Sequence, residues 1–167
     1  MKVIGLTGWS GSGKTTLLTA MVRILVARGM SVSTVKHAHH GFDIDQPGKD
    51  SYRHRQAGAR EVLVCSAQRW VLLHENDGPA PSLSELLRII QPVDLVLVEG
   101  FKADPGTKLE VYRPGLGKQR LWPEMPEVAA VASDALLPGC DRRVLPLDCP
   151  DAVADWVAGI LPRLPSA

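Results

Sequence analysis

The most informative part of this chain is the glycine-rich stretch Gly8-Trp9-Ser10-Gly11-Ser12-Gly13-Lys14-Thr15. It fits the phosphate-binding loop pattern, in which a glycine, any four residues, a second glycine and a lysine precede Ser or Thr. The glycines permit backbone angles that a Cβ would forbid, so several N–H groups can point together at phosphate oxygens. Lys14 brings a positive charge to the β- and γ-phosphates, and the Thr15 hydroxyl is a ligand for Mg²⁺. The predicted nucleotide-binding residues are Gly8, Ser10, Gly11, Ser12, Gly13, Lys14, Thr15 and Thr16.

The residues on either side of this loop predict a strand–turn–helix unit. Val3 to Leu6 form a short apolar run that is typical of a buried parallel strand. After the loop, one apolar stripe recurs at helical spacing through Leu17, Leu18, Met21, Val22, Leu25 and Val26. Gly29 stands where a helix-ending glycine belongs. A glycine-rich turn that binds nothing is the alternative, and this context argues against it.

Composition limits the class of protein. The 167 residues suit a single domain over 1–167, and with 45% hydrophobic residues the chain can bury a sizeable core. Lys and Arg total 19 and Asp and Glu total 18, which argues against a broad nucleic-acid or membrane surface. We see no signal peptide and no apolar run of membrane-spanning length. The three cysteines lack close zinc spacing, so we expect reduced thiols in a cytoplasmic protein.

Strands and helices alternate along the rest of the chain. This alternation predicts an α/β fold, a three-layer sandwich with a mostly parallel sheet, as in a P-loop NTPase. Further strands are predicted at 31–36, 61–64, 70–73, 94–98, 108–111, 128–132 and 144–147. Pro146 places the last of these at a sheet edge. Helices are predicted at 51–58, at 82–90 and after a capping Asp148, and segment 112–127 is predicted to be a mobile or partner-binding loop.

Glu99 is the first candidate outside the phosphate loop. It ends the apolar strand 94–98 and precedes Gly100. An acidic residue at this point suits a Walker B role, in which it holds Mg²⁺ directly or through water. We therefore assign Glu99 as a catalytic residue and as a metal ligand together with Thr15. An ordinary solvated carboxylate at a strand end is the alternative, which the phosphate loop disfavours.

Acidic residues also follow the second predicted strand. In an open parallel sheet, the loops at the carboxyl ends of the strands form the ligand crevice. Asp43, Asp45 or Asp50 can there hold Mg²⁺ or orient an attacking water. We take Asp43 as a metal ligand and Asp45 as a catalytic residue. Solvated turn-forming residues are an equally open interpretation.

The same segment concentrates histidines and cations. His37, His39, His40 and His54 cluster in sequence, but their spacing matches no zinc signature, so contact with a ligand is favoured over a metal site. Arg53 and Arg55 are predicted to bind a second anionic ligand or the triphosphate itself, and a solvated helix face is the alternative.

Asp134 follows the predicted strand 128–132 and is a candidate for reading the base. A carboxylate at this point can accept hydrogen bonds from N1 and N2 of guanine. The full Asn-Lys-x-Asp guanine signature is absent, so the motif alone does not decide between guanine and adenine. A simple turn at the strand end is equally compatible with the sequence.

Taken together, the motifs resemble those of the molybdopterin-guanine dinucleotide biosynthesis protein B (MobB) family. The resemblance covers nearly the whole chain. It rests on four stretches, which are residues 8–15, residues 35–40 running into 42–45, residues 47–51 with 53–55 and 57–59, and residues 98–102. The first stretch, the phosphate loop, is shared with many NTPases, whereas the second and third are more specific.

The resemblance implies a protein that binds GTP with Mg²⁺, has weak GTPase activity and forms homodimers. It implies a fold similar to the P-loop class that contains dethiobiotin synthetase and metal-chaperone GTPases. The implied role is that of an adaptor to the guanylyltransferase that joins GMP to molybdopterin. Molybdopterin itself carries a phosphate, which the cations between residues 37 and 60 would suit.

Two other functions compete with this interpretation. One is a small-molecule kinase or ATP-dependent ligase, for which Arg113 and Arg120 would supply a lid. The other is a nickel- or zinc-delivery GTPase, which only the histidine cluster supports. A homodimer is also expected because the apolar strands near Trp70 and Lys108 would otherwise leave an open sheet edge.

Overall fold

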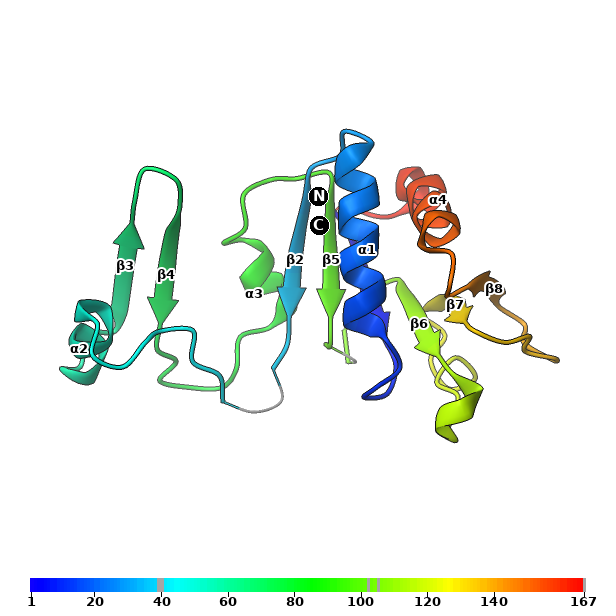
Figure 1. Ribbon diagram of the computed structural model, residues 1–167, viewed down its shortest axis with the longest axis horizontal. Coiled ribbons are helices and arrows are strands. Elements are labelled where there is room, and N and C mark those ends of the chain that lie inside the picture. Colours follow the sequence, from blue (N-terminus) through cyan, green and yellow to red (C-terminus); the bar gives the residue numbers. More distant parts are fainter. Residues whose placement is uncertain (39–40, 102, 105, 167) are drawn as a thin grey trace. The chain divides into compact units, whose positions relative to one another are not determined.

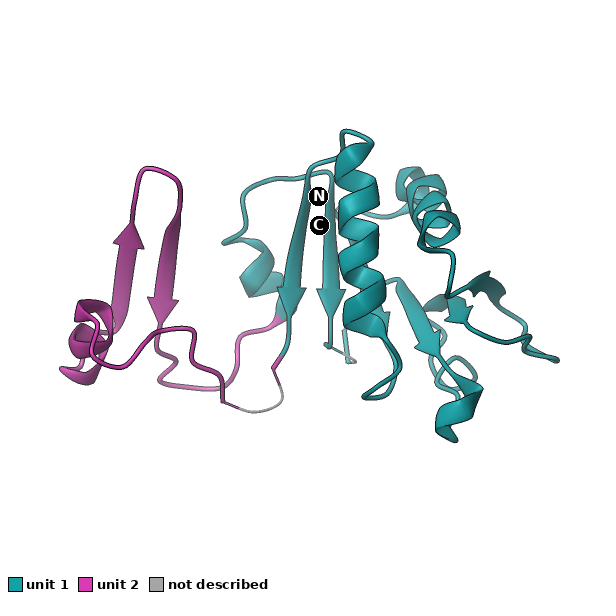
Figure 2. Cartoon of the chain, in the orientation of Figure 1, with its two compact units in different colours: residues 1–37, 83–167 teal, residues 38–82 magenta. Residues whose placement is uncertain are grey.

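The computed structural model describes residues 1–38, 41–101, 103–104 and 106–166. Three residues of the sequence motifs, His39, His40 and Lys102, lie outside the described residues. The chain forms two compact units, Met1–His37 with Leu83–Ala167 and Ala38–Ser82, which Figure 2 shows in separate colours. The single domain over residues 1–167 stays a prediction, and we describe each unit by itself.

The first unit is built on a six-stranded sheet with the order β2-β5-β1-β6-β7-β8 (Figure 1). Every neighbouring pair in it is parallel. The predicted α/β fold with a mostly parallel sheet is confirmed. The strands are β1 (Lys2–Thr7), β2 (Val32–Lys36), β5 (Leu95–Glu99), β6 (Lys108–Tyr112), β7 (Val128–Ser133) and β8 (Arg143–Pro146).

Strand β5 shows why this sheet needs a layer on each face. Its residues Leu95 to Val98 are all buried, although successive side chains point to opposite faces. Leu95 and Leu97 belong to the core beneath α1 (Lys14–Ala27) and α4 (Pro150–Ile160), which cover one face. Val96 and Val98 pack on the other face with Leu83, the first residue of α3 (Leu83–Leu87). The uninterrupted apolar run therefore reflects burial on both faces.

A buried carboxylate fastens the segment that follows β6. Glu110 is fully buried in β6, and its two carboxylate oxygens accept the N–H groups of Leu121 at 3.0 Å and Trp122 at 2.8 Å. Burial raises the pKa of Glu110, and the two N–H donors act against that rise. Trp122 is only 3% exposed and packs edge-on against Tyr112. The segment 112–127, predicted as a mobile or partner-binding loop, is therefore packed at Trp122 and begins with Tyr112, which ends β6.

The second unit consists of α2 (Asp50–Gln56) and an antiparallel hairpin of β3 (Glu61–Cys65) and β4 (Trp70–His74). Both strands were predicted. The two-stranded sheet leaves much of its apolar surface exposed, since each strand has only the other as its partner. Exposed large apolar residues of this hairpin are Leu63, Val64, Trp70, Val71 and Leu72.

The structure corrects three expectations about element ends and edges. The helix predicted over 82–90 ends at Leu87, after which two i→i−3 bonds tighten the chain into turns. Cys149, not Asp148, is the N-cap of α4, and no side chain caps that helix. The strand at Lys108 lies between β1 and β7, so it is not an open edge, whereas Pro146 does lie in the edge strand β8.

Short 3₁₀ turns complete the first unit, one at Pro114–Leu116 and one at Leu161–Arg163 after α4. Within the described part of the chain, no helix has the length and apolar character needed to cross a membrane.

We predict that Glu110→Gln lowers the free energy of unfolding by about 1–3 kcal/mol, because the amide NH₂ would face an N–H donor and leave it unpaired. Urea unfolding followed by tryptophan fluorescence measures this. Glu124→Gln, at an exposed position of the same segment, is the matched control and should change stability little. Equal stability of wild type and Glu110→Gln would contradict the fastening role of Glu110.

Candidate functional site

The phosphate loop leaves β1 at a point where only glycine fits. Gly8 has φ of 138°, and a Cβ on it would lie 2.4 Å from the carbonyl oxygen of Val111 in β6. Gly13, with φ of 97°, is the N-cap of α1 in the left-handed conformation. No side-chain hydrogen bond caps this helix. The loop thus combines close backbone packing with a helix N-terminus that faces it, which fits a phosphate group.

Lys14 lies over the loop that precedes it. Its Nζ donates to the carbonyl oxygens of Gly8 at 2.9 Å and Trp9 at 2.8 Å. The ammonium group is therefore held at the N-terminus of α1, where an anionic ligand would meet both charges. Ser12 is buried, so its contribution to a ligand would come from its backbone, whereas Ser10 and Thr16 are exposed.

Thr15 and Glu99 meet across the sheet. Parallel pairing of β1 with β5 sets Leu6 opposite Glu99, which brings the end of β5 beside the first turn of α1. The Thr15 hydroxyl lies 2.9 Å and 3.0 Å from the two carboxylate oxygens of Glu99. A hydroxyl and a carboxylate next to a phosphate loop are the hard oxygen donors that Mg²⁺ prefers. The structure thus brings two of the three predicted metal ligands together, Thr15 and Glu99, and their chemistry fits the ion.

The chain after Glu99 is tightly shaped. Gly100 has φ of 100°, and a Cβ on it would lie 2.6 Å from the Cβ of His37. The His37 N–H donates to the Glu99 carbonyl at 2.8 Å, and its ring packs against Phe101 with centroids 4.9 Å apart. Phe101 has φ of 44°, which is uncommon for a residue with a side chain. These contacts hold the carboxyl ends of β2 and β5 beside the Thr15–Glu99 pair.

Two of the four clustered histidines, His37 and His54, belong to the described residues. Among the described residues, no group of three or more His, Cys, Asp or Glu side chains could hold a metal ion. His37 packs on Phe101 at the end of β5, and His54 lies exposed in α2.

Three hydrogen bonds around the phosphate loop, two from Arg113 and one from Trp9, were not predicted from the sequence. Arg113 donates from Nε to the Ser12 carbonyl at 3.0 Å and from Nη1 to Asp134 Oδ2 at 2.9 Å. The Trp9 indole N–H donates to the Gln119 carbonyl at 2.7 Å. Asp134 is therefore linked to the phosphate loop through Arg113. The sequence pattern had suggested Arg113 only as part of a kinase lid, and its position directly after β6 was the available signal.

The candidates of the second unit form an ion-pair network around Arg55. Its guanidinium bonds Asp43 at 2.7 Å, Asp45 at 3.1 Å and Glu75 at 2.8 Å. The Arg55 and Asp45 side chains are only 14% and 7% exposed. Hydrogen bonds to the carboxylates of Asp43, Glu75 and Asp45 raise the pKa of Arg55. The hydrogen bond from Arg55 in turn lowers the pKa of Asp43.

In the described chain, Asp43, Asp45 and Arg55 bond one another and so have a structural role. Asp45 also accepts the Ser51 hydroxyl at 2.8 Å, so the network fastens the segment before α2 onto that helix. Arg53 is exposed, with Asp50 at 4.0 Å. The assignments of Asp43 to metal, Asp45 to catalysis and the two arginines to an anion stay predictions.

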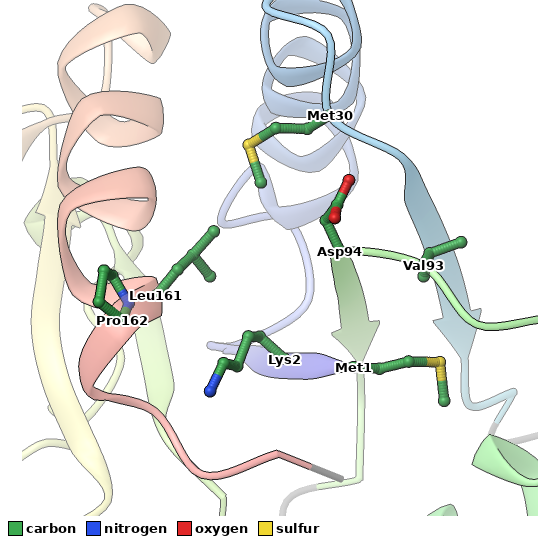
Figure 3. A pocket seen from close by; sticks show the side chains of 7 residues that line it. All are labelled: Met1, Lys2, Met30, Val93, Asp94, Leu161 and Pro162. Atoms are coloured by element: carbon green, nitrogen blue, oxygen red, sulfur yellow. The ribbon is translucent and has the colours of Figure 1, made fainter.

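An open groove of about 600 Å³ lies at the other end of the strands, where β1 and β5 begin (Figure 3). Lys2 and Asp94 lie at the amino ends of β1 and β5, whereas ligands of open α/β sheets bind at the carboxyl ends. The Asp94 carboxylate accepts both the N–H and the hydroxyl of Ser31, which lowers its pKa. This groove is therefore not the candidate site.

The family model and the relatives that match most of the chain agree on one family. The family model described as molybdopterin guanine dinucleotide synthesis protein B matches residues 3–134. The chain is 40% identical to a molybdopterin-guanine dinucleotide biosynthesis adapter protein of Haemophilus influenzae, over 93% of this chain and 86% of that protein. It is 40% identical to the protein of the same name from Escherichia coli, over 93% and 90%. A MobB protein homolog from Bacillus stearothermophilus superposes with a TM-score of 0.74 at 26% identity, covering 98% of this chain and 99% of that one.

We predict that Gly8→Ala lowers the free energy of unfolding by about 2 kcal/mol or more, since the new Cβ meets the Val111 carbonyl and the backbone angle is strained. Thermal unfolding should show a lower midpoint temperature, and nucleotide titration should show weaker binding. Gly115→Ala is the control, because a Cβ there meets open space. A Gly8→Ala protein as stable as this control would show that the loop does not pack against β6 as described.

Proposed function

This chain belongs to the molybdopterin-guanine dinucleotide synthesis protein B (MobB) family, and we propose that it is a GTP-binding adapter in the assembly of the molybdopterin guanine dinucleotide cofactor. The observation that carries the nucleotide part is the contact between Thr15 and Glu99 beside the phosphate loop. Their oxygens would hold Mg²⁺, and Lys14 with the N-terminus of α1 would hold the phosphates. The adapter part rests on the names of the relatives.

GTP is the proposed nucleotide because Asp134 lies at the carboxyl end of β7 and is linked to the phosphate loop. Guanine offers two N–H donors on one edge, and a carboxylate only accepts hydrogen bonds. Adenine presents an unprotonated ring nitrogen on that edge, which a carboxylate would repel. The position and charge of Asp134 therefore favour guanine.

We propose that hydrolysis of the bound nucleotide is slow, because the sequence shows no clear glutamine to orient an attacking water and no clear arginine finger. A bound Mg²⁺ would neutralise charge that develops on the phosphate oxygens. Glu99 is the proposed ligand of that ion, and its two carboxylate oxygens lie 2.9 Å and 3.0 Å from the Thr15 hydroxyl. Arg113 bonds Ser12 and Asp134 instead of projecting as a lid over the phosphates, which speaks for a binding protein over a kinase. The partner we propose is the guanylyltransferase that joins GMP to molybdopterin.

We also propose that the protein is a homodimer formed through the second unit. The hairpin of β3 and β4 exposes a row of apolar side chains and two outer strand edges. Exposed strand edges with apolar faces favour pairing with another chain, and a second copy is the partner always present.

Light scattering of the wild type should therefore report twice the mass of 18.1 kDa. Leu63→Asp should shift the mass toward the monomer, because Leu63 is 62% exposed on the hairpin and a carboxylate there would oppose an apolar interface. Leu136→Asp, at a 90% exposed position of the first unit, should leave the mass unchanged. A wild type that stays monomeric at micromolar concentration would overturn the dimer.

Replacing Lys14 by Ala should weaken GTP binding by roughly 100-fold or more, because charge-assisted contacts to phosphate are strong. Calorimetric titration with Mg·GTP measures the affinity. Arg23→Ala removes one exposed cation from the same helix and serves as the matched control. If Lys14→Ala binds GTP as tightly as Arg23→Ala, the phosphate-loop assignment fails.

A further inference from the structure

The strand order places the loops that follow β1, β6 and β7 side by side at the carboxyl ends of the strands. Strand β6 lies between β1 and β7, and all three are parallel. The residues that directly follow these strands are Gly8, Arg113 and Asp134. A side chain at the middle position can therefore reach the phosphate loop on one side and the end of β7 on the other.

Arg113 makes both of these contacts. Its Nε donates to the Ser12 carbonyl at 3.0 Å and its Nη1 donates to Asp134 Oδ2 at 2.9 Å. Its Nη2 lies 3.5 Å from where a Cβ of Gly13 would be, so the guanidinium rests against the N-cap of α1. Because the guanidinium is planar and rigid, two bonds from one group fix the Asp134 carboxylate at a set distance from the loop backbone.

Electrostatics add a reason for this arrangement. A cation at a helix N-terminus is disfavoured by the helix dipole, and here both Arg113 and Lys14 lie at the N-terminus of α1. The carboxylate of Asp134 compensates the charge of Arg113 through the ion pair. Both partners are partly exposed, so the pair itself adds little stability and its geometry is the more telling feature.

We propose that Arg113 is a positioning residue that fixes Asp134 relative to the phosphate loop and thereby sets the selectivity for guanine. This inference rests on the proposed function, in which the site binds GTP and Asp134 accepts hydrogen bonds from the base. When the loop holds the phosphates, the length of the nucleotide limits where the base can meet Asp134. Asp134 can then accept both N1–H and the 2-amino group only if its carboxylate is held in one orientation.

The alternative role for Arg113 is direct contact with the triphosphate. The two roles predict different losses. Loss of a phosphate contact weakens every nucleoside triphosphate equally, whereas loss of positioning weakens GTP more than a nucleotide whose base offers Asp134 fewer N–H donors. Inosine triphosphate separates them, because hypoxanthine keeps N1–H and lacks the 2-amino group.

The experiment measures dissociation constants of Mg·GTP and Mg·ITP for the wild type, Arg113→Met, Arg113→Lys, Asp134→Ala and the double variant Arg113→Met/Asp134→Ala. Arg120→Met is the matched control, since its guanidinium lies over the Trp122 ring in the same segment. Circular dichroism and thermal unfolding establish that each variant is folded. Arg113→Lys preserves the charge but lacks the fork that reaches both acceptors, so it remains informative if Arg113→Met is unstable.

The wild type should prefer GTP over ITP by roughly tenfold or more, the value of a hydrogen bond to a charged acceptor. Arg113→Met and Asp134→Ala should each bring this ratio close to one, the double variant should add nothing further, and Arg113→Lys should lose most of the preference. Arg120→Met should behave like the wild type.

Equal weakening of GTP and ITP by Arg113→Met, with the ratio kept, would overturn the inference in favour of a phosphate contact. An unchanged ratio in Asp134→Ala, or no preference in the wild type, would overturn it as well while leaving triphosphate binding intact. A wild type that binds neither nucleotide would refute the proposed function itself, and the inference with it.

Discussion

The placement of β1 between β5 and β6, with all three strands parallel, is the constraint on which the site depends. Pairing with β5 brings Glu99 to the first turn of α1, where its carboxylate meets the Thr15 hydroxyl. Pairing with β6 brings the Val111 carbonyl so close to Gly8 that a Cβ would not fit. The phosphate loop is thus shaped from both sides by strands distant in sequence, and the carboxyl edge of the sheet gathers the candidate ligands.

Much of this arrangement is visible in the sequence because its causes are local. The phosphate-loop glycines, the apolar run from Leu95 to Val98 and Glu99 at its end each follow from a few adjacent residues. The contacts of Arg113 and Glu110 do not. They depend on which strands become neighbours and on which charged side chains are buried, and neither is encoded in a short pattern. Glu110 stands in an ordinary strand sequence, yet it is fully buried with two N–H donors from a segment that composition had marked as mobile.

The second unit shows a different limit. The high density of cationic residues between positions 37 and 60 predicts an anion site. In the structure, however, acidic residues of the same unit bond the Arg55 guanidinium. Arg55 reaches Asp43, Asp45 and Glu75, which leaves the exposed Arg53 as the better remaining candidate for a ligand contact. Ion pairs that close within a segment are hard to foresee because they depend on side-chain reach and on a turn before α2. Charge density alone therefore does not identify a binding surface.

In the proposed function, Thr15 and Glu99 would hold a divalent ion on a triphosphate bound in the phosphate loop. A crystal structure with a non-hydrolysable GTP analogue and Mn²⁺ tests it most directly, since anomalous scattering locates the ion. We expect a single strong peak within bonding distance of the Thr15 hydroxyl, facing Glu99, with the phosphates over Lys14. An ordered analogue bound away from residues 8–15, or an ion peak remote from both side chains, would contradict it.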